Sequence, residues 1–186
     1  LAQARELASI PGMKSDIARR FRDKDVMKDV LRAAGVPVAA SQLVSSSAEL
    51  RRFIDQVGYP VIVKPQAGVG SRGTHRVESA ADLAALEQLG LSPGPQRPLQ
   101  VEQFIRAREF TCETVSIHGK PVWRSGTRYF PTPLEVLETP WIQYCVLLPR
   151  EVEAPWTTFH PVNSAALDAL FGDEKEVTGT ALTHME

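Results

Sequence analysis

The chain has 186 residues, of which 43% are apolar and 23% are charged. These values are typical of a globular protein and exclude disordered, collagen-like and coiled-coil classes. Lys and Arg total 21 against 22 Asp and Glu, for a net charge of −1, so we expect neither nucleic acid nor a membrane as a partner. The two cysteines, Cys112 and Cys145, are too few for a disulfide framework and indicate reduced thiols and a cytoplasmic location.

The first half of the chain alternates between helical and extended patterns. An apolar stripe repeats with helical spacing after Asp23, and Gly35 stands where a helix ends. A β-branched run between two prolines predicts a buried strand. In chain order we expect two short helices over 1–22, a helix over 23–34, an extended segment over 36–44, a helix from the serine cluster 45–47 to Gly58, strands over 59–65 and 75–77, and a helix over 79–89.

The second half is richer in strands. Alternating residues from Phe110 onward, followed by a turn at 118–120, predict a hairpin. The remaining expectations are a loop over 91–98, a strand over 99–105, a return strand over 121–129, an irregular stretch over 131–156 with a short strand at 144–148, a helix over 163–171 and a strand over 177–186. Because no turn follows that last strand, we expect this chain to be a segment of a larger protein.

A glycine-rich loop over 68–73 follows the strand that ends near Lys64. It matches G-x-G-x-x-G, but a strand pattern follows it where a dinucleotide-binding turn would open a helix. The Walker signature is missing, and a protein-kinase lysine would come after the glycines. What remains is a lysine before a hairpin whose backbone N–H groups can surround phosphate oxygens. The alternative is a flexible hairpin beside a surface lysine.

The loop is one of several motifs that occur in a specific order. These are Arg22-Asp23-Lys24, Ala34-Gly35-Val36-Pro37-Val38, Gly58 to Pro65, Gly68 to Gly73, Val101-Glu102-Gln103-Phe104-Ile105 and Glu109-Phe110-Thr111. In this order and at these spacings the chain, from about residue 16 to 186, resembles the ATP-grasp superfamily. It resembles most the carboxylate–amine/thiol ligase branch, which includes D-alanine ligases, biotin carboxylases and amino-acid ligases.

The resemblance implies an α+β fold in which two α+β subdomains clasp ATP. We expect N-terminal helices over 1–37, a lid subdomain over 38–98 and a second subdomain over 99–186 that is incomplete at its C-terminus.

The resemblance also assigns residues to ATP and Mg²⁺. Lys24 matches the first nucleotide lysine, at the α-phosphate, and Lys64 matches the second, which we also take as the catalytic residue. The lid hairpin contributes Gly68, Gly70, Ser71 and Gly73 over the β- and γ-phosphates. Adenine would be held by Glu102 and by the backbone around Gln103 and Phe104, the ribose hydroxyls by Glu109, and a magnesium ion by Glu186.

Some of these residues also have a structural interpretation. Lys24 could pair with Asp23 or Asp25 on a solvated helix, and Glu109 could pair with Arg106 or Arg108. For Glu102 the functional interpretation is favoured over the structural one, because a charged side chain in an apolar strand is costly unless it is paired.

The function that the resemblance implies is that of the ATP-binding core of an ADP-forming ligase. Its substrates would be a small-molecule carboxylate and an amine, joined through an acyl-phosphate. The alternatives are a non-catalytic ATP-binding or scaffold module and a bicarbonate-using carboxylase of the same superfamily. The family's second metal ligand would lie beyond Glu186, so we expect the chain by itself to be inactive. Any homo-oligomer would form through parts outside this chain.

Overall fold

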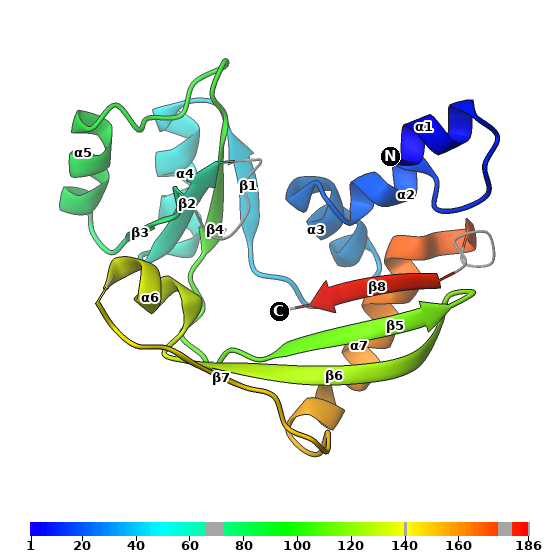
Figure 1. Ribbon diagram of the computed structural model, residues 1–186. Helices are drawn as coiled ribbons and strands as arrows, with labels where there is room; N and C mark the ends of the chain where they lie inside the picture. The colour runs from blue at the N-terminus through cyan, green and yellow to red at the C-terminus, as the bar shows by residue number, and fades with distance from the viewer. Residues whose placement is uncertain (66–72, 140, 175–179, 186) are drawn as a thin grey trace. The chain divides into compact units, whose positions relative to one another are not determined.

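The computed structural model describes residues 1–65, 73–139, 141–174 and 180–185, which divide into two units by their internal contacts (Figure 1). The β4 unit comprises Asp23–Lys28 and Val38–Ala107. The α7 unit comprises Leu1–Arg22, Asp29–Pro37 and Arg108–Glu186. No helix among the described residues combines the length and the apolar character that crossing a bilayer requires.

The β4 unit is a four-stranded antiparallel sheet with two helices on one face (Figure 1). Its strands lie in the order β1-β4-β2-β3. Both helices begin at a serine whose side chain accepts a backbone hydrogen bond: Ser46 from Glu49, and Ser79 from Asp82. The elements are β1 (Ser41–Val44), α4 (Ser47–Val57), β2 (Val61–Pro65), β3 (His75–Val77), α5 (Ala80–Gln88) and β4 (Leu99–Gln103).

The two faces of this sheet differ in chemistry. One face packs Val61, Val63 and Val101 against apolar side chains of α4 and α5, such as Phe53 and Leu83, in a buried core. Because side chains alternate along a strand, the residues between them point to the other face. By the pairing register, that second face carries Ser41, Leu43, Ile62, Lys64, Arg76, Gln100 and Glu102. It is the polar face of the unit.

The α7 unit holds a second four-stranded sheet, in the order β7-β6-β5-β8. The long helix α7 contacts β5, and the short helix α2 contacts α7 through Phe21 and Phe171, whose rings lie 5.0 Å apart. The elements are α1 (Ala2–Leu7), α2 (Ser15–Arg20), β5 (Thr111–Ile117), β6 (Lys120–Phe130), α6 (Pro133–Glu138), β7 (Cys145–Leu147), α7 (Trp156–Phe171), the 3-10 turn η1 (Gly172–Glu174) and β8 (Thr180–Met185).

Three features differ from the sequence-based expectations. Helix α6 lies inside the stretch 131–156 that we expected to contain only a short strand, and the capping box of Thr132 and Glu135 explains its start. Helix α7 begins at Trp156 rather than near Asn163, in spite of Pro161. The boundary between the units falls after Ala107, whereas we expected it at 98/99. Strand β4 pairs with β1 and β2 and therefore belongs to the same unit as they do.

Candidate functional site

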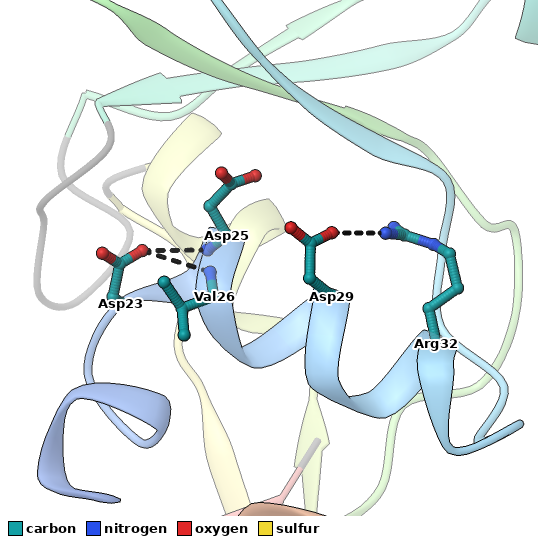
Figure 2. Close-up of polar contacts among 5 residues, drawn as sticks. All are labelled: Asp23, Asp25, Val26, Asp29 and Arg32. Atoms are coloured by element: carbon teal, nitrogen blue, oxygen red, sulfur yellow. Dashed lines mark hydrogen bonds and ion pairs between the residues drawn. The ribbon is translucent and has the colours of Figure 1, made fainter. Parts of the chain in front are cut away.

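The start of helix α3 (Lys24–Ala33) carries Lys24, the predicted nucleotide lysine, and Lys28. The side chain of Asp23 caps this helix, as Figure 2 shows: its Oδ1 accepts hydrogen bonds from the backbone N–H groups of Asp25 (3.2 Å) and Val26 (3.3 Å). The cap fixes Lys24 as the first helical residue. Lys28 then follows one turn later on the same side, since residues four apart are neighbours on a helix surface.

Glu102 on β4 holds two lysines at once. The Nζ of Lys64 lies 2.7 Å from Oε2 of Glu102, and the Nζ of Lys28 lies 2.8 Å from Oε1. All three side chains are largely buried, with exposed fractions of 12%, 13% and 18% for Lys28, Glu102 and Lys64. Each oxygen of the Glu102 carboxylate thus has one ammonium group beside it.

The electrostatics of this cluster favour an ionised Glu102. Burial alone would raise the pKa of its carboxyl, but the positive charges of Lys64 and then Lys28, with their hydrogen bonds, outweigh burial and hold the pKa below its ordinary value. Two ammonium groups thus meet at one carboxylate on a largely buried surface, and ammonium groups are compact positive charges that bind anions such as phosphate.

Sequence reasoning missed Lys28 and Gln100. Lys28 could have been found from its spacing, four residues after Lys24 in a predicted helix. Gln100 is the direct partner of Lys64 across the β2–β4 ladder and lies two residues before Glu102, on the same face. It is 1% exposed. A polar residue between Leu99 and Val101 in a buried strand was the signal for it.

The segment after β4 was predicted to contact adenine through its backbone. In the structure the N–H of Gln103 donates to the carbonyl of Ala40 (2.9 Å), and the N–H of Phe104 donates to that of Pro60 (3.3 Å). Both donors are thus used within the protein. Two guanidinium groups lie near the ring of Phe104, with the Cζ of Arg76 at 5.6 Å and that of Arg106 at 5.9 Å from its centroid. Such cation–π contacts fix the ring beside the polar face.

The other predicted site residues fall elsewhere. Gly68, Gly70, Ser71 and Glu186 lie outside the described residues. Gly73 has φ +72°, and a Cβ there would come within 3.2 Å of Pro65 Cγ, so glycine suits both its conformation and its packing. Glu109 belongs to the α7 unit.

The described residues offer no complete metal site. Among residues 1–65, 73–139, 141–174 and 180–185, no three His, Cys, Asp or Glu side chains gather as metal ligands would. A small pocket at the end of the sheet includes Lys64 of the cluster. Its lining residues are Val63, Lys64, Pro65, Gly73, His75, Leu86, Leu91, Arg97 and Leu99.

Comparison with known proteins gives a family. Residues 23–116, half of the chain, match the family described as carbamoyl-phosphate synthase L chain, ATP binding domain. The carbamoyl phosphate synthase large chain of Thermus thermophilus is 29% identical over 112 residues, which is 60% of this chain and 11% of that relative. That of Pseudothermotoga lettingae is 27% identical over 108 residues, 58% of this chain and 10% of the relative. The chain therefore spans about a tenth of these relatives.

Solved structures with similar folds are larger than this chain. An L-amino acid ligase from Bacillus licheniformis has a TM-score of 0.67 at 21% identity, over 98% of this chain and 41% of that one. A D-alanine–D-alanine ligase from Bacillus anthracis, complexed with ATP, has a TM-score of 0.66 at 19% identity, over 99% and 57%. A carboxyaminoimidazole ribonucleotide synthase from Aspergillus clavatus, complexed with ATP, has a TM-score of 0.68 at 20% identity, over 97% and 45%.

At these identities the solved structures establish the fold, and the family model establishes the relationship. The α+β ATP-grasp fold expected from the motifs is confirmed. The chain belongs to the family of carbamoyl-phosphate synthase L chain ATP binding domains, within the ATP-grasp superfamily.

Proposed function

We propose that this chain is the nucleotide-binding core of an ATP-dependent, ADP-forming carboxylate–amine ligase. The observation that carries the proposal is the cluster of Lys28, Glu102 and Lys64. Two ammonium groups meet at one carboxylate on the polar face of the β4 unit, and such groups are compact positive charges that can bind phosphate. The strand that supplies Lys64 ends at Pro65 and leads into the glycine-rich segment.

Lys64 is the residue that we expect to contact phosphate. Its ion pair with Glu102 already restricts the side chain, so little rotamer entropy is lost when an anion arrives. Its ammonium would then stabilise the charge that spreads over the phosphoryl oxygens during transfer. Lys24, one turn before Lys28, would add a second positive charge.

The reaction would proceed in two steps. A substrate carboxylate oxygen attacks the γ-phosphorus of ATP, the bond to the bridging oxygen breaks, and ADP leaves with its electron pair. The amine then attacks the acyl carbon, and phosphate departs as the C–N bond forms and the amine loses a proton. Mg²⁺ would enter with ATP and neutralise phosphate charge, and Glu186 is its proposed ligand from this chain.

Titration calorimetry of the chain with ATP in the presence of Mg²⁺ tests the proposal. We expect ATP to bind and AMP, which lacks the β- and γ-phosphates, to bind at least ~10-fold more weakly, on the scale of one or two charge-assisted contacts. Absence of ATP binding at millimolar concentration would refute the proposed function. A coupled ADP assay with a carboxylate and an amine tests activity separately.

A further inference from the structure

Exposed apolar side chains gather around strand β7, at one edge of the sheet in the α7 unit (Figure 1). The stretch from 141 to 148 holds six large apolar residues that are each at least 38% exposed, and Trp141 is 83% exposed. We call these six the apolar edge: Trp141, Ile142, Tyr144, Val146, Leu147 and Leu148. Such a concentration on the surface of a folded unit indicates a site of protein–protein contact.

The backbone of β7 is open on its outer side as well. The strand is last in the order β7-β6-β5-β8, and within the described part of the chain its three residues pair only with β6. An edge strand presents N–H and C=O groups that can pair with another strand, and proteins often protect such an edge with lysine or proline. The stretch 141–148 contains neither residue. The sequence thus does nothing to prevent pairing at this edge.

The absence of charge at the apolar edge favours a second copy of the same chain as the partner. No Asp, Glu, Lys or Arg lies between Glu138 and Arg150. When two copies of one strand pair about a two-fold axis, the residues near the axis face their own counterparts. Like charges that face each other across a strand pair are destabilising, so only an uncharged strand pairs well with itself. A partner recognised by its charge would find no counterpart here.

The area of the apolar edge approaches what a dimer needs. At about 200 Å² for a fully exposed large side chain, the six residues leave about 600 Å² of surface exposed. That is the upper end of the range for the largest apolar patch on a typical monomer, about 300–600 Å². A standard interface buries about 800 Å² on each partner. Phe130, on the neighbouring strand β6, is 40% exposed and adds to the area.

We propose that the apolar edge is a self-association surface, at which two copies of this chain join with their β7 strands antiparallel about a two-fold axis at Val146. Val146 then lies opposite its own counterpart, and Tyr144 lies opposite Leu148 of the partner subunit. Because β7 is short, burial of the apolar side chains supplies most of the stability. The proposal is independent of the proposed function. It differs from our expectation that any homo-oligomer would form through parts outside this chain.

Analytical ultracentrifugation of the chain at about 1–100 µM tests the proposal, since interfaces of standard size have dissociation constants at or below the micromolar range. We expect a dimer whose dissociation constant changes little with salt, because no charges meet at the axis. Leu148→Lys should weaken the dimer at least ~10-fold, because each dimer then buries two added charges. Leu89→Lys makes the same change at an exposed leucine at the end of α5 and should dimerise like wild type.

Two variants of Val146 test the two-fold axis. Val146→Lys and Val146→Glu should each be monomeric, because like charges then oppose each other at the axis. An equimolar mixture of the two variants should form a dimer, because lysine then opposes glutamate. Circular dichroism establishes that each variant is folded. If a Val146 variant does not fold, the comparison of Leu148→Lys with Leu89→Lys decides, since both leucines are largely exposed.

Cys145 reports the geometry of the pairing. In the proposed register the two copies of Cys145 are diagonal neighbours across the strand pair, about 7–8 Å apart. Its thiol is exposed, whereas that of Cys112 is buried. A short bismaleimide, which adds one thiol at each end, should therefore cross-link the wild-type dimer and leave Cys145→Ser uncross-linked.

Three results would overturn the proposal. They are a wild-type chain that stays monomeric at ~100 µM, a dimer that Leu148→Lys leaves intact, and a dimer whose Cys145 thiols do not cross-link. The first would assign the apolar edge to a partner other than a second copy, and the second would place the dimer interface on another surface. The third would exclude the antiparallel pairing of β7.

Discussion

Lys28 of α3 and Glu102 of β4 form an ion pair of 2.8 Å, with exposed side-chain fractions of only 12% and 13%. Lys64 holds the other oxygen of the same carboxylate at 2.7 Å. Glu102 thus joins the second turn of α3 to the strand that precedes the glycine-rich segment. Because Lys28 and Lys64 bind the same carboxylate, the position of the Lys64 ammonium depends in part on Lys28, a residue that we did not expect at the site.

Lys28→Met should destabilise the protein and raise the pKa of the Glu102 carboxyl. The methionine preserves the aliphatic stem, so the main loss is one buried charge contact, about 1–3 kcal/mol. The carboxylate keeps Lys64 and does not become an isolated buried charge. Chemical denaturation gives the stability change, and carbon NMR of the carboxyl gives the pKa. An unchanged pKa would show that Lys28 does not act on Glu102.

The stability of the folded chain should depend on Glu102 at acid pH. Its pKa is lower in the folded state than in the unfolded chain, so the unfolded state binds more protons as the pH falls. The contribution of this group is complete above about pH 5, beyond the ordinary glutamate pKa, and is lost as the pH falls through the lowered folded value.

Unfolding free energies measured from pH 7 to pH 3 test this dependence. Glu102→Gln should be less stable at pH 7 by about 3 kcal/mol, because two buried ammonium groups lose their carboxylate. The difference in unfolding free energy between wild type and Glu102→Gln should become smaller toward pH 3. Glu151→Gln, which changes an exposed carboxyl, is the control. A gap between wild type and Glu102→Gln that stays constant with pH would contradict the account.

Gly126→Ala should destabilise the α7 unit. A Cβ at Gly126 on β6 would lie 2.0 Å from Cδ1 of Trp156, so the indole at the start of α7 must move. Overpacking of this kind costs about 1–3 kcal/mol. Gly94→Ala is the matched control, because no atom lies within 4 Å of its Cβ position and it should change stability by less than about 0.5 kcal/mol. Equal stability of the two variants would rule out tight packing at Gly126.

Asn163→Ala should destabilise the same unit through a buried polar network. Oδ1 of Asn163, which is 1% exposed, accepts from Thr114 Oγ1 (3.0 Å) and from Arg124 Nε (3.1 Å). Removing it deprives both donors of an acceptor, at a cost of about 2–3 kcal/mol. In a double-mutant cycle with Thr114→Val, the combined loss should be smaller than the sum of the single losses. Strict additivity would show that the two side chains do not interact.

The sequence predicted the elements of the β4 unit well because each has a local signal. Serine caps, terminal glycines and the valine run of β2 act within a few residues, so the order of motifs was enough to predict the fold. The region 131–156 was harder. The start of α7 depends on packing, since Phe110 on the approach to β5 holds Trp156 edge-on at 5.5 Å, and local propensity does not encode such a contact.

The candidate site was predictable in part for the same reason. Lys64 and Glu102 follow from motifs, but their pairing depends on the register of β2 against β4, which brings residues distant in sequence together. Lys28 and Gln100 carry no motif of their own. Lys28 depends on where α3 begins, and the burial of Gln100 appears only in the folded unit.

ATP titration of wild type, Lys64→Ala and Lys120→Ala is the decisive comparison, with circular dichroism to confirm that all three are folded. Lys120 is an exposed lysine at the start of β6 and controls for the loss of one positive charge. If the Lys64 ammonium contacts phosphate, Lys64→Ala should weaken ATP binding roughly 10- to 150-fold, the value of one charge-assisted hydrogen bond. Lys120→Ala should bind ATP like wild type. Equal ATP affinity of wild type and Lys64→Ala, in equally folded proteins, would contradict a nucleotide site built on Lys64 and Glu102.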